Sequence, residues 1–137
     1  MSFILEVHTP LRLFFSGPVE AVITTLMDGE AGIYANHSPF TSPVMTGILK
    51  IKDEKGLWKE AFITDGILEV KRSRTVLLIE HAEWPGEIDI ERAEKARSDA
   101  LAVLEAGAFR FETESARTKL KRANIRLAIA KKKTERP

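Results

Sequence analysis

The 137-residue sequence contains no cysteine. A disulfide framework, a thiolate nucleophile and thiolate metal ligands are therefore excluded. Aromatic residues make up only 7%, and no apolar run approaches the roughly 20 residues that a membrane-spanning helix needs. The start, MSFILEVHTP, lacks the basic region and apolar stretch of a secretory signal, so we expect a cytosol-like compartment.

Patterns typical of catalysis or metal binding are also missing. His8, His37 and His81 are scattered, without the paired spacing of a zinc site. Ser38 follows His37 in a proline-flanked loop, where adjacent side chains seldom converge as a nucleophile and its base. No glycine-rich phosphate loop ending in Lys-Ser or Lys-Thr occurs. We therefore expect a protein that is not an enzyme and requires no metal or cofactor.

The formal net charge of +1 hides an asymmetry along the chain. Residues 1–86 carry 8 Lys and Arg against 11 Asp and Glu, whereas residues 87–137 carry 13 against 9. Within the second part, residues 115–137 hold nine basic residues and a single acidic one. This basic end favours an anionic partner.

The hydrophobic pattern changes once, near Pro85-Gly86. Before that point, short β-branched and apolar runs are separated by turn signals, which is typical of an antiparallel sandwich or barrel. In one of these runs, LRLFF, alternation places Leu11, Leu13 and Phe15 on one face. The runs cover residues 3–7, 11–15, 19–24, 47–52, 58–63, 66–70 and 75–80.

After Gly86 the apolar residues recur with a helical period. Asp89 is expected to cap a helix over residues 90–105, which Gly107 ends, and a second helix is expected to begin near Thr113-Glu114. Because the apolar stripe is rich in alanine, each residue buries little area, so the helix pair is expected to be marginally stable and movable. The stripe comprises Ala93, Ala96, Ala100, Leu101, Leu104, Ala116, Leu120, Ala123, Leu127 and Ala130.

Arg92 stands at the third position of the first helix, where a cation opposes the helix dipole. Such a placement costs roughly 0.3–1 kcal/mol when the residue is exposed. One interpretation is that Arg92 simply pairs with Asp89 or Glu91 at the surface. The other is that it binds an anionic ligand.

Several segments in fixed order resemble the epsilon subunit of the bacterial F-type ATP synthase. They are FILEVHTP, FFSGPVEAVITTLMDGEAGIYANHSPF, GILKI, DGILEV, TVLLIEHAE, IDIERAEKA and LKRANIRLAIA, and together they extend over nearly the whole chain. The resemblance implies an antiparallel β-sandwich of about ten strands over residues 1–86, followed by an antiparallel two-helix hairpin over residues 87–137. Two loops depart from the family pattern. Tyr34-Ala35-Asn36 replaces the usual leucine, proline and glycine, and Asp65-Gly66 stands where two glycines are common.

The resemblance also implies a role in ATP synthesis coupled to proton or other ion transport. In that family the sandwich contacts the gamma subunit and the c-subunit ring, as part of the turning central stalk. The hairpin extends toward the alpha and beta subunits and inhibits ATP hydrolysis. The resemblance implies a peripheral protein at the cytoplasmic face of the inner membrane, held to the membrane only through the complex and binding no nucleic acid.

ATP is a possible regulatory ligand by the same resemblance, because many members bind it through a segment of the form Ile/Leu-Asp-x-x-Arg-Ala. A like-charged pair such as Arg122 and Arg126 costs an isolated helix roughly 0.2–0.5 kcal/mol, which an anion between them would offset. Asp99 departs from the family, which often has an arginine there, and Arg97 is a partial substitute. The matching residues are Glu83, Ile88, Asp89, Arg92, Ala93, Arg122 and Arg126.

The basic second helix allows two further interpretations. The resemblance implies contact with an acidic loop of the beta subunit, whereas an alternative function is a module that binds nucleic acid or an anionic membrane surface. The absence of aromatic residues from 112–137 and of a large apolar face argues against the alternative. A third interpretation is that the lysine run only complements the helix end and stays solvated. The residues expected at the beta subunit are Arg117, Lys121, Arg122, Lys131, Lys132 and Lys133.

Overall fold

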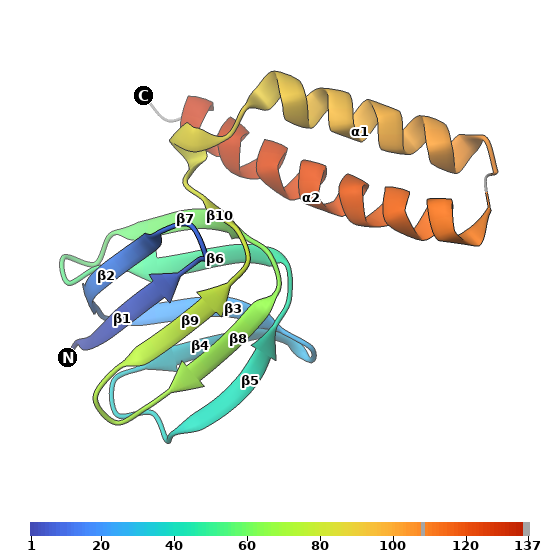
Figure 1. Cartoon of the computed structure of the whole chain (residues 1–137). Helices are drawn as coiled ribbons and strands as arrows, with labels where there is room; N and C mark the ends of the chain where they lie inside the picture. The colour runs from blue at the N-terminus through green and yellow to red at the C-terminus, as the bar shows by residue number, and fades with distance from the viewer. Residues whose placement is uncertain (108, 136–137) are drawn as a thin grey trace. The chain divides into compact units, whose positions relative to one another are not determined.

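The computed structural model describes residues 1–107 and 109–135, with side chains described as far as Lys132 (Figure 1). The chain forms two compact units, Met1–Glu83 and a second that begins at Trp84. The change of hydrophobic pattern near Pro85-Gly86 predicted a boundary after residue 86, three residues later than the boundary in the structure.

The first unit is a β-sandwich of two five-stranded sheets, which confirms the predicted fold (Figure 1). The first sheet has the order β2-β1-β9-β8-β5 and the second has the order β10-β7-β6-β3-β4. The strands are β1 (Phe3–His8), β2 (Leu13–Val19), β3 (Ala21–Leu26), β4 (Gly29–Tyr34), β5 (Phe40–Val44), β6 (Gly47–Lys52), β7 (Trp58–Ile63), β8 (Gly66–Val70), β9 (Thr75–Ile79) and β10 (Ala82–Glu83).

One strand pair of the sandwich is parallel. β1 runs alongside β9 with Leu5 opposite Thr75, whereas the other pairs within this fully described unit are antiparallel. The two strands that contain proline, β2 with Pro18 and β5 with Pro43, both lie at the edges of the first sheet. Edge positions tolerate a residue that has no backbone N–H to donate.

Alternating side chains from both sheets form the core of the sandwich. In β6, Leu49 and Ile51 are buried. The prediction for LRLFF was wrong at its start, because β2 begins at Leu13. Leu13 and Phe15 do share one face of this strand, whereas its buried residues are Phe14 and Val19. Among the largest fully buried side chains of this unit are Leu5, Val7, Val19, Val22, Ile33, Leu49, Ile51, Phe62, Ile63, Leu68 and Leu77.

The second unit is a helical hairpin that follows a short 3₁₀ turn, η1 (Pro85–Glu87). Helix α1 (Ile90–Glu105) has the predicted bounds, and Gly107 follows it with a φ of 64°, the left-handed conformation of a helix stop. Helix α2 (Arg110–Glu135) begins three residues before the predicted start. The two helices run antiparallel and pack side by side (Figure 1).

The predicted alanine stripe of the hairpin is largely confirmed. Its alanines at positions 93, 100, 116, 123 and 130 are buried, together with Leu127. Leu101 was wrongly included, since it is 42% exposed, and the buried Ile129 was missed. A buried methyl group contributes only about 0.8 kcal/mol, against about 1.5–3 kcal/mol for a whole leucine, so this stripe stabilises the hairpin weakly for its length.

Candidate functional site

The first turn of α1 is fixed by its capping residue. Asp89 Oδ1 accepts a hydrogen bond from the Arg92 backbone N–H at 3.1 Å, which confirms the predicted N-cap. Ile88, the residue before the N-cap, and Ala93, the fourth residue of the helix, are both buried, as in a hydrophobic staple. The Asp89 carboxylate therefore has a partner within the helix turn.

The Arg92 side chain is exposed at this turn. Among the described side chains, no carboxylate lies within ion-pair distance of its guanidinium group. The interpretation that Arg92 pairs with Asp89 or Glu91 is therefore not what the structure shows. A cation at a helix start without a counter-ion is suited to an anionic ligand.

The fold of the hairpin brings the predicted arginines to one level. Arg92 lies 15 residues before Gly107, and Arg122 lies 15 residues after it. Because both helices rise about 1.5 Å per residue, antiparallel packing places these two arginines at the same height along the hairpin. Arg126, one turn further along α2, lies toward the start of α1.

Of the three arginines, Arg122 gives the strongest support for an anionic ligand. Its side chain is half-buried, and its Nε atom is buried with no hydrogen-bond partner among the described residues. A buried donor left unpaired costs about 1–3 kcal/mol, and more where it is charged. Such a cost is removed when an anion accepts the bond.

Two further residues bear on the predicted nucleotide site: Glu83 was expected to belong to it, and Asp99 departs from the family pattern. Glu83 belongs to β10 in the sandwich unit, and its carboxylate lies 3.5 Å from Nε2 of His81. Asp99 is exposed on α1, seven residues beyond Arg92. At about 1.5 Å per residue this separation is about 10 Å, so the charge of Asp99 is largely screened at the level of Arg92.

The basic residues expected to contact the beta subunit divide into two groups. Arg117 and Lys121 are exposed and lie one turn apart on α2, whereas Arg122 is half-buried. Lys131 and Lys132 are also exposed, and the side chain of Lys133 lies outside the described residues. The exposed members form the surface that is open to a partner.

Metal binding and membrane spanning have no support in the described residues. No three His, Cys, Asp or Glu side chains among them converge as metal ligands. No helix in this part of the chain combines the length and apolar character that crossing a membrane requires.

Sequence reasoning missed the role of Asp65, whose substitution for glycine was noted only as a loop departure. Asp65 Oδ1 accepts hydrogen bonds from the backbone N–H of Thr46 at 2.8 Å and from its hydroxyl at 2.7 Å. These bonds join the β5–β6 turn to the β7–β8 turn. The following Gly66 has no room for a side chain, because a Cβ there would collide with the Leu78 carbonyl.

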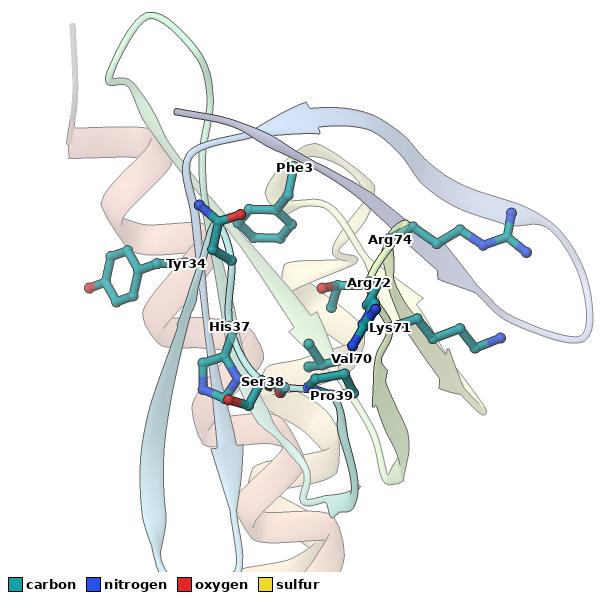
Figure 2. Close-up of a pocket in the computed structure, with 11 residues that line it drawn as sticks. Phe3, Tyr34, His37, Ser38, Pro39, Val70, Lys71, Arg72 and Arg74 are labelled. Atoms are coloured by element: carbon teal, nitrogen blue, oxygen red, sulfur yellow. Dashed lines mark hydrogen bonds between the residues drawn. The ribbon is translucent and has the colours of Figure 1, made fainter.

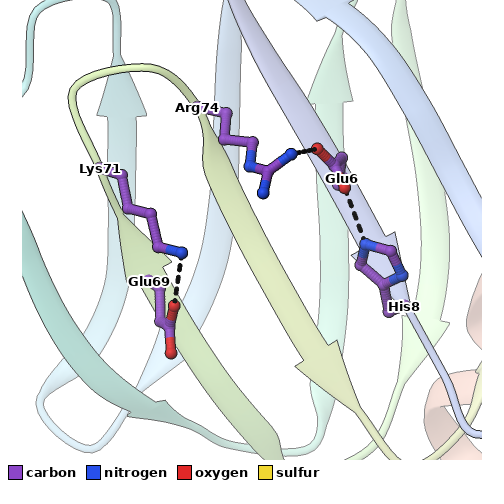
Figure 3. Close-up of polar contacts among 5 residues, drawn as sticks. All are labelled: Glu6, His8, Glu69, Lys71 and Arg74. Atoms are coloured by element: carbon purple, nitrogen blue, oxygen red, sulfur yellow. Dashed lines mark hydrogen bonds and ion pairs between the residues drawn. The ribbon is translucent and has the colours of Figure 1, made fainter.

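An ion-pair group on the outer face of the first sheet was also not predicted (Figure 3). Glu6 lies 2.9 Å from Nε2 of His8 and 2.8 Å from the Arg74 guanidinium. The hydrogen bond with His8 and the nearby charge of Arg74 hold the pKa of the Glu6 carboxyl below its usual value. Beside it, Lys71 lies 3.4 Å from Glu69.

Comparison with known proteins connects both units to one family. A family model described as the ATP synthase delta/epsilon chain, beta-sandwich domain, matches residues 2–85. The ATP synthase epsilon chain of Caldanaerobacter subterraneus subsp. tengcongensis is 45% identical over 135 residues, covering 98% of this chain and 97% of the relative. The chain belongs to the ATP synthase epsilon-chain family. This membership confirms the resemblance drawn from the sequence.

Other members of the epsilon-chain family and solved structures agree. The ATP synthase epsilon chain of Caldicellulosiruptor bescii is 43% identical, covering 97% of this chain and 96% of its own length. A chain in the structure titled Euglena gracilis mitochondrial ATP synthase, OSCP/F1/c-ring, has a TM-score of 0.71 at 23% identity, covering 95% of this chain and 78% of that chain. At this identity the likeness concerns the fold alone.

Proposed function

We propose that the chain is a non-catalytic rotor subunit of the central stalk of ATP synthase. Its partners are the gamma subunit and the c-subunit ring, and it is held peripherally at the cytoplasmic face of the inner membrane through the complex. Family membership supports this assignment, and so does a solved structure of the same fold, titled Tetrahymena thermophila mitochondrial ATP synthase, central stalk/c-ring.

Exposed apolar side chains on the sandwich support a permanent protein contact. On the outer face of the first sheet, register places His8 beside Leu78 and Leu78 beside Ile67. Leu78 and Ile67 are each 45% exposed, and Leu13 on β2 is 55% exposed. Grouped apolar residues of this kind mark protein interfaces.

The experiment that tests the rotor assignment is reconstitution of the matching complex in lipid vesicles, with and without this chain. We expect ion-gradient-driven ATP synthesis to require the chain, although the chain itself shows no ATPase activity. Equal synthesis rates in its absence contradict the assignment.

The helical hairpin is the regulatory part of the proposal. Its alanine-rich interface buries little apolar area per residue. The free energies of a packed and an extended state can therefore differ by only a few kcal/mol. In the extended state the hairpin reaches the alpha and beta subunits, and the exposed Arg117, Lys121, Lys131 and Lys132 contact an acidic loop of the beta subunit and inhibit hydrolysis. Neutralising these residues is expected to raise the ATPase rate of the assembled complex, and an unchanged rate contradicts this role.

The unpaired Nε of Arg122 carries the ligand part of the proposal. ATP binds the packed hairpin with its phosphates on Arg92, Arg122 and Arg126, and so favours the packed state. Asp99, about two turns away and largely screened at this level of the hairpin, lowers the affinity only slightly. Isothermal titration of ATP into the full chain tests this, and the absence of heat up to millimolar nucleotide contradicts it.

The alternative of a module that binds nucleic acid or an anionic membrane surface is less well supported. Its only favourable feature is the basic charge of α2, which the rotor proposal also uses. A salt titration of binding to a random DNA duplex separates the two, because nucleic-acid binding driven by phosphate contacts weakens steeply with salt.

A further inference from the structure

A second basic site lies in the sandwich unit, well apart along the chain from the hairpin arginines. A pocket of about 430 Å³, here called the end pocket, lies between the β4–β5 loop and the β8–β9 turn (Figure 2). Its volume is in the range of small-molecule sites. It is lined by Phe3, Tyr34, Asn36, His37, Ser38, Pro39, Val70, Lys71, Arg72, Arg74 and Thr75.

The Lys and Arg residues that line the end pocket give it a positive charge. Three of its lining residues are Lys71, Arg72 and Arg74, and none of the lining residues is a carboxylate. Lys71 and Arg74 pair with Glu69 and Glu6 on the outer face of the sheet (Figure 3). Two of the three cations are thus partly neutralised outside the pocket.

Arg72 is the cation that stays open to a ligand. Within the described residues it makes no ion pair. Figure 2 shows its side chain turned toward Ser38 and Pro39, whereas Lys71 and Arg74 extend to the opposite side. A guanidinium group in this setting offers paired donors to a phosphate.

The β4–β5 loop supplies a second donor. Asn36 has a φ of 63°, a left-handed conformation that asparagine tolerates better than most residues with a side chain. Within the part of the chain that the structure describes, its Nδ2 has a hydrogen bond only with Met1 Sδ, at 4.0 Å, and a thioether is a weak acceptor. The amide is therefore available to a stronger acceptor in the pocket. Phe3 and Val70 add an apolar part to the lining.

We propose that the end pocket binds the phosphate group of a small organic phosphate or a phospholipid headgroup. Arg72 and the Asn36 amide hold the phosphate oxygens, and the apolar lining contacts the group that carries the phosphate. This site is separate from the proposed ATP site and does not depend on it. An acidic protein segment is the competing ligand, but the single open guanidinium and the small volume favour one phosphate group.

Amide chemical shifts of the isotope-labelled full chain test the proposal by NMR titration. The probes are inorganic phosphate, glycerol 3-phosphate, and phosphatidylcholine vesicles with or without phosphatidylglycerol. We expect saturable changes at residues 36–38 and 70–75. Arg72→Gln should weaken binding at least about tenfold, as the loss of a charged hydrogen bond predicts. Asn36→Gly keeps the left-handed backbone and should also weaken binding, whereas Lys55→Gln, an exposed charge control, should not.

The probes distinguish the sources of the phosphate. Saturation by either soluble phosphate identifies a free phosphate compound as sufficient, and changes only with phosphatidylglycerol vesicles identify a lipid headgroup. The proposal is overturned if Arg72→Gln binds as the parent chain does, or if no probe changes these amides. It is also overturned if phosphate changes only the hairpin residues 88–93 and 122–126, or if a short polyglutamate peptide saturates the pocket where phosphate does not.

Discussion

Replacing Arg122 with methionine should stabilise the hairpin without nucleotide and remove its response to ATP. Methionine keeps an unbranched side chain as far as the position of the arginine Nε, but it carries a methyl group there in place of the donor. Removing the unpaired buried donor is worth about 1–3 kcal/mol. Relief of the like-charge pair with Arg126 adds roughly 0.2–0.5 kcal/mol. Without ATP, the variant hairpin should therefore open less often than the parent hairpin.

ATP should reverse this order. The advantage of the variant without ATP amounts to about 1.2–3.5 kcal/mol. A ligand at about 1,000 times its Kd stabilises the state that binds it by more than this, about 4.1 kcal/mol. The parent hairpin should gain this amount, while the Arg122→Met hairpin should gain much less because one of its three phosphate-binding arginines is missing. The two chains should therefore cross, with the variant more stable alone and the parent more stable with saturating ATP.

Hydrogen exchange of the α2 amides at Ala123 and Leu127 measures this opening directly, since each 1.4 kcal/mol changes the exchange rate by about tenfold. Arg117→Met is the matched control, because Arg117 is exposed on the same helix and should change neither state by more than about 0.5 kcal/mol. The reasoning is refuted if Arg122→Met exchanges faster than the parent without ATP. Equal protection of both chains by ATP refutes the ligand assignment.

Three further changes test the sandwich. Asp65→Ala removes both hydrogen bonds to the buried Thr46, so the free energy of unfolding by urea should fall by about 1–3 kcal/mol, and an unchanged midpoint contradicts the proposed turn contact. Gly66→Ala forces a Cβ against the backbone of β9 and should cost about 1–3 kcal/mol in the same assay, and a cost below about 0.5 kcal/mol contradicts the close approach of the two strands. Glu6→Gln removes a carboxyl whose pKa is lowered in the folded state, so it should reduce stability at neutral pH. That difference should shrink as the pH falls below about 4.5, and a pH-independent difference contradicts the ion-pair explanation.

The parts of the fold that sequence could predict are those with strong local signals. Asp89 and the Gly107 stop fixed both ends of α1, because capping and left-handed glycine are properties of a few adjacent residues. The start of α2 at Arg110 had no comparable capping residue, and its prediction was wrong by one turn.

Three strands were not among the apolar runs identified from the sequence: β4, β5 and the two-residue β10. β4 contains two glycines and β5 contains a proline, which weaken any local strand pattern. Their pairing with β3 and β8 brings them into the sheets, so tertiary contacts override the local preference. The order of the strands, including the parallel β1–β9 pair, likewise depends on contacts between distant residues.

The candidate site likewise combines features that the sequence could predict with features that it could not. The motif around Arg92 and the charged pair on α2 could be found from spacing, because helical periodicity decides which residues share a face. The unpaired Nε of Arg122 and the open Arg72 of the end pocket could not, since burial and the absence of a partner arise only when distant segments pack. Asn36 shows both cases. The sequence showed that it replaces the glycine usual in the family, but only the structure shows that it is exposed at the end pocket.

The most direct test of the central claim is the ATPase rate of the matching rotor-and-head complex. It should be measured with the full chain and with a chain ending at Glu87, over a range of ATP concentrations. The account predicts a higher rate for the truncated chain at low ATP, and a difference that diminishes as ATP fills the site on Arg92, Arg122 and Arg126. Equal rates at every ATP concentration contradict the account and leave the sandwich as the only working part of the chain in the rotor.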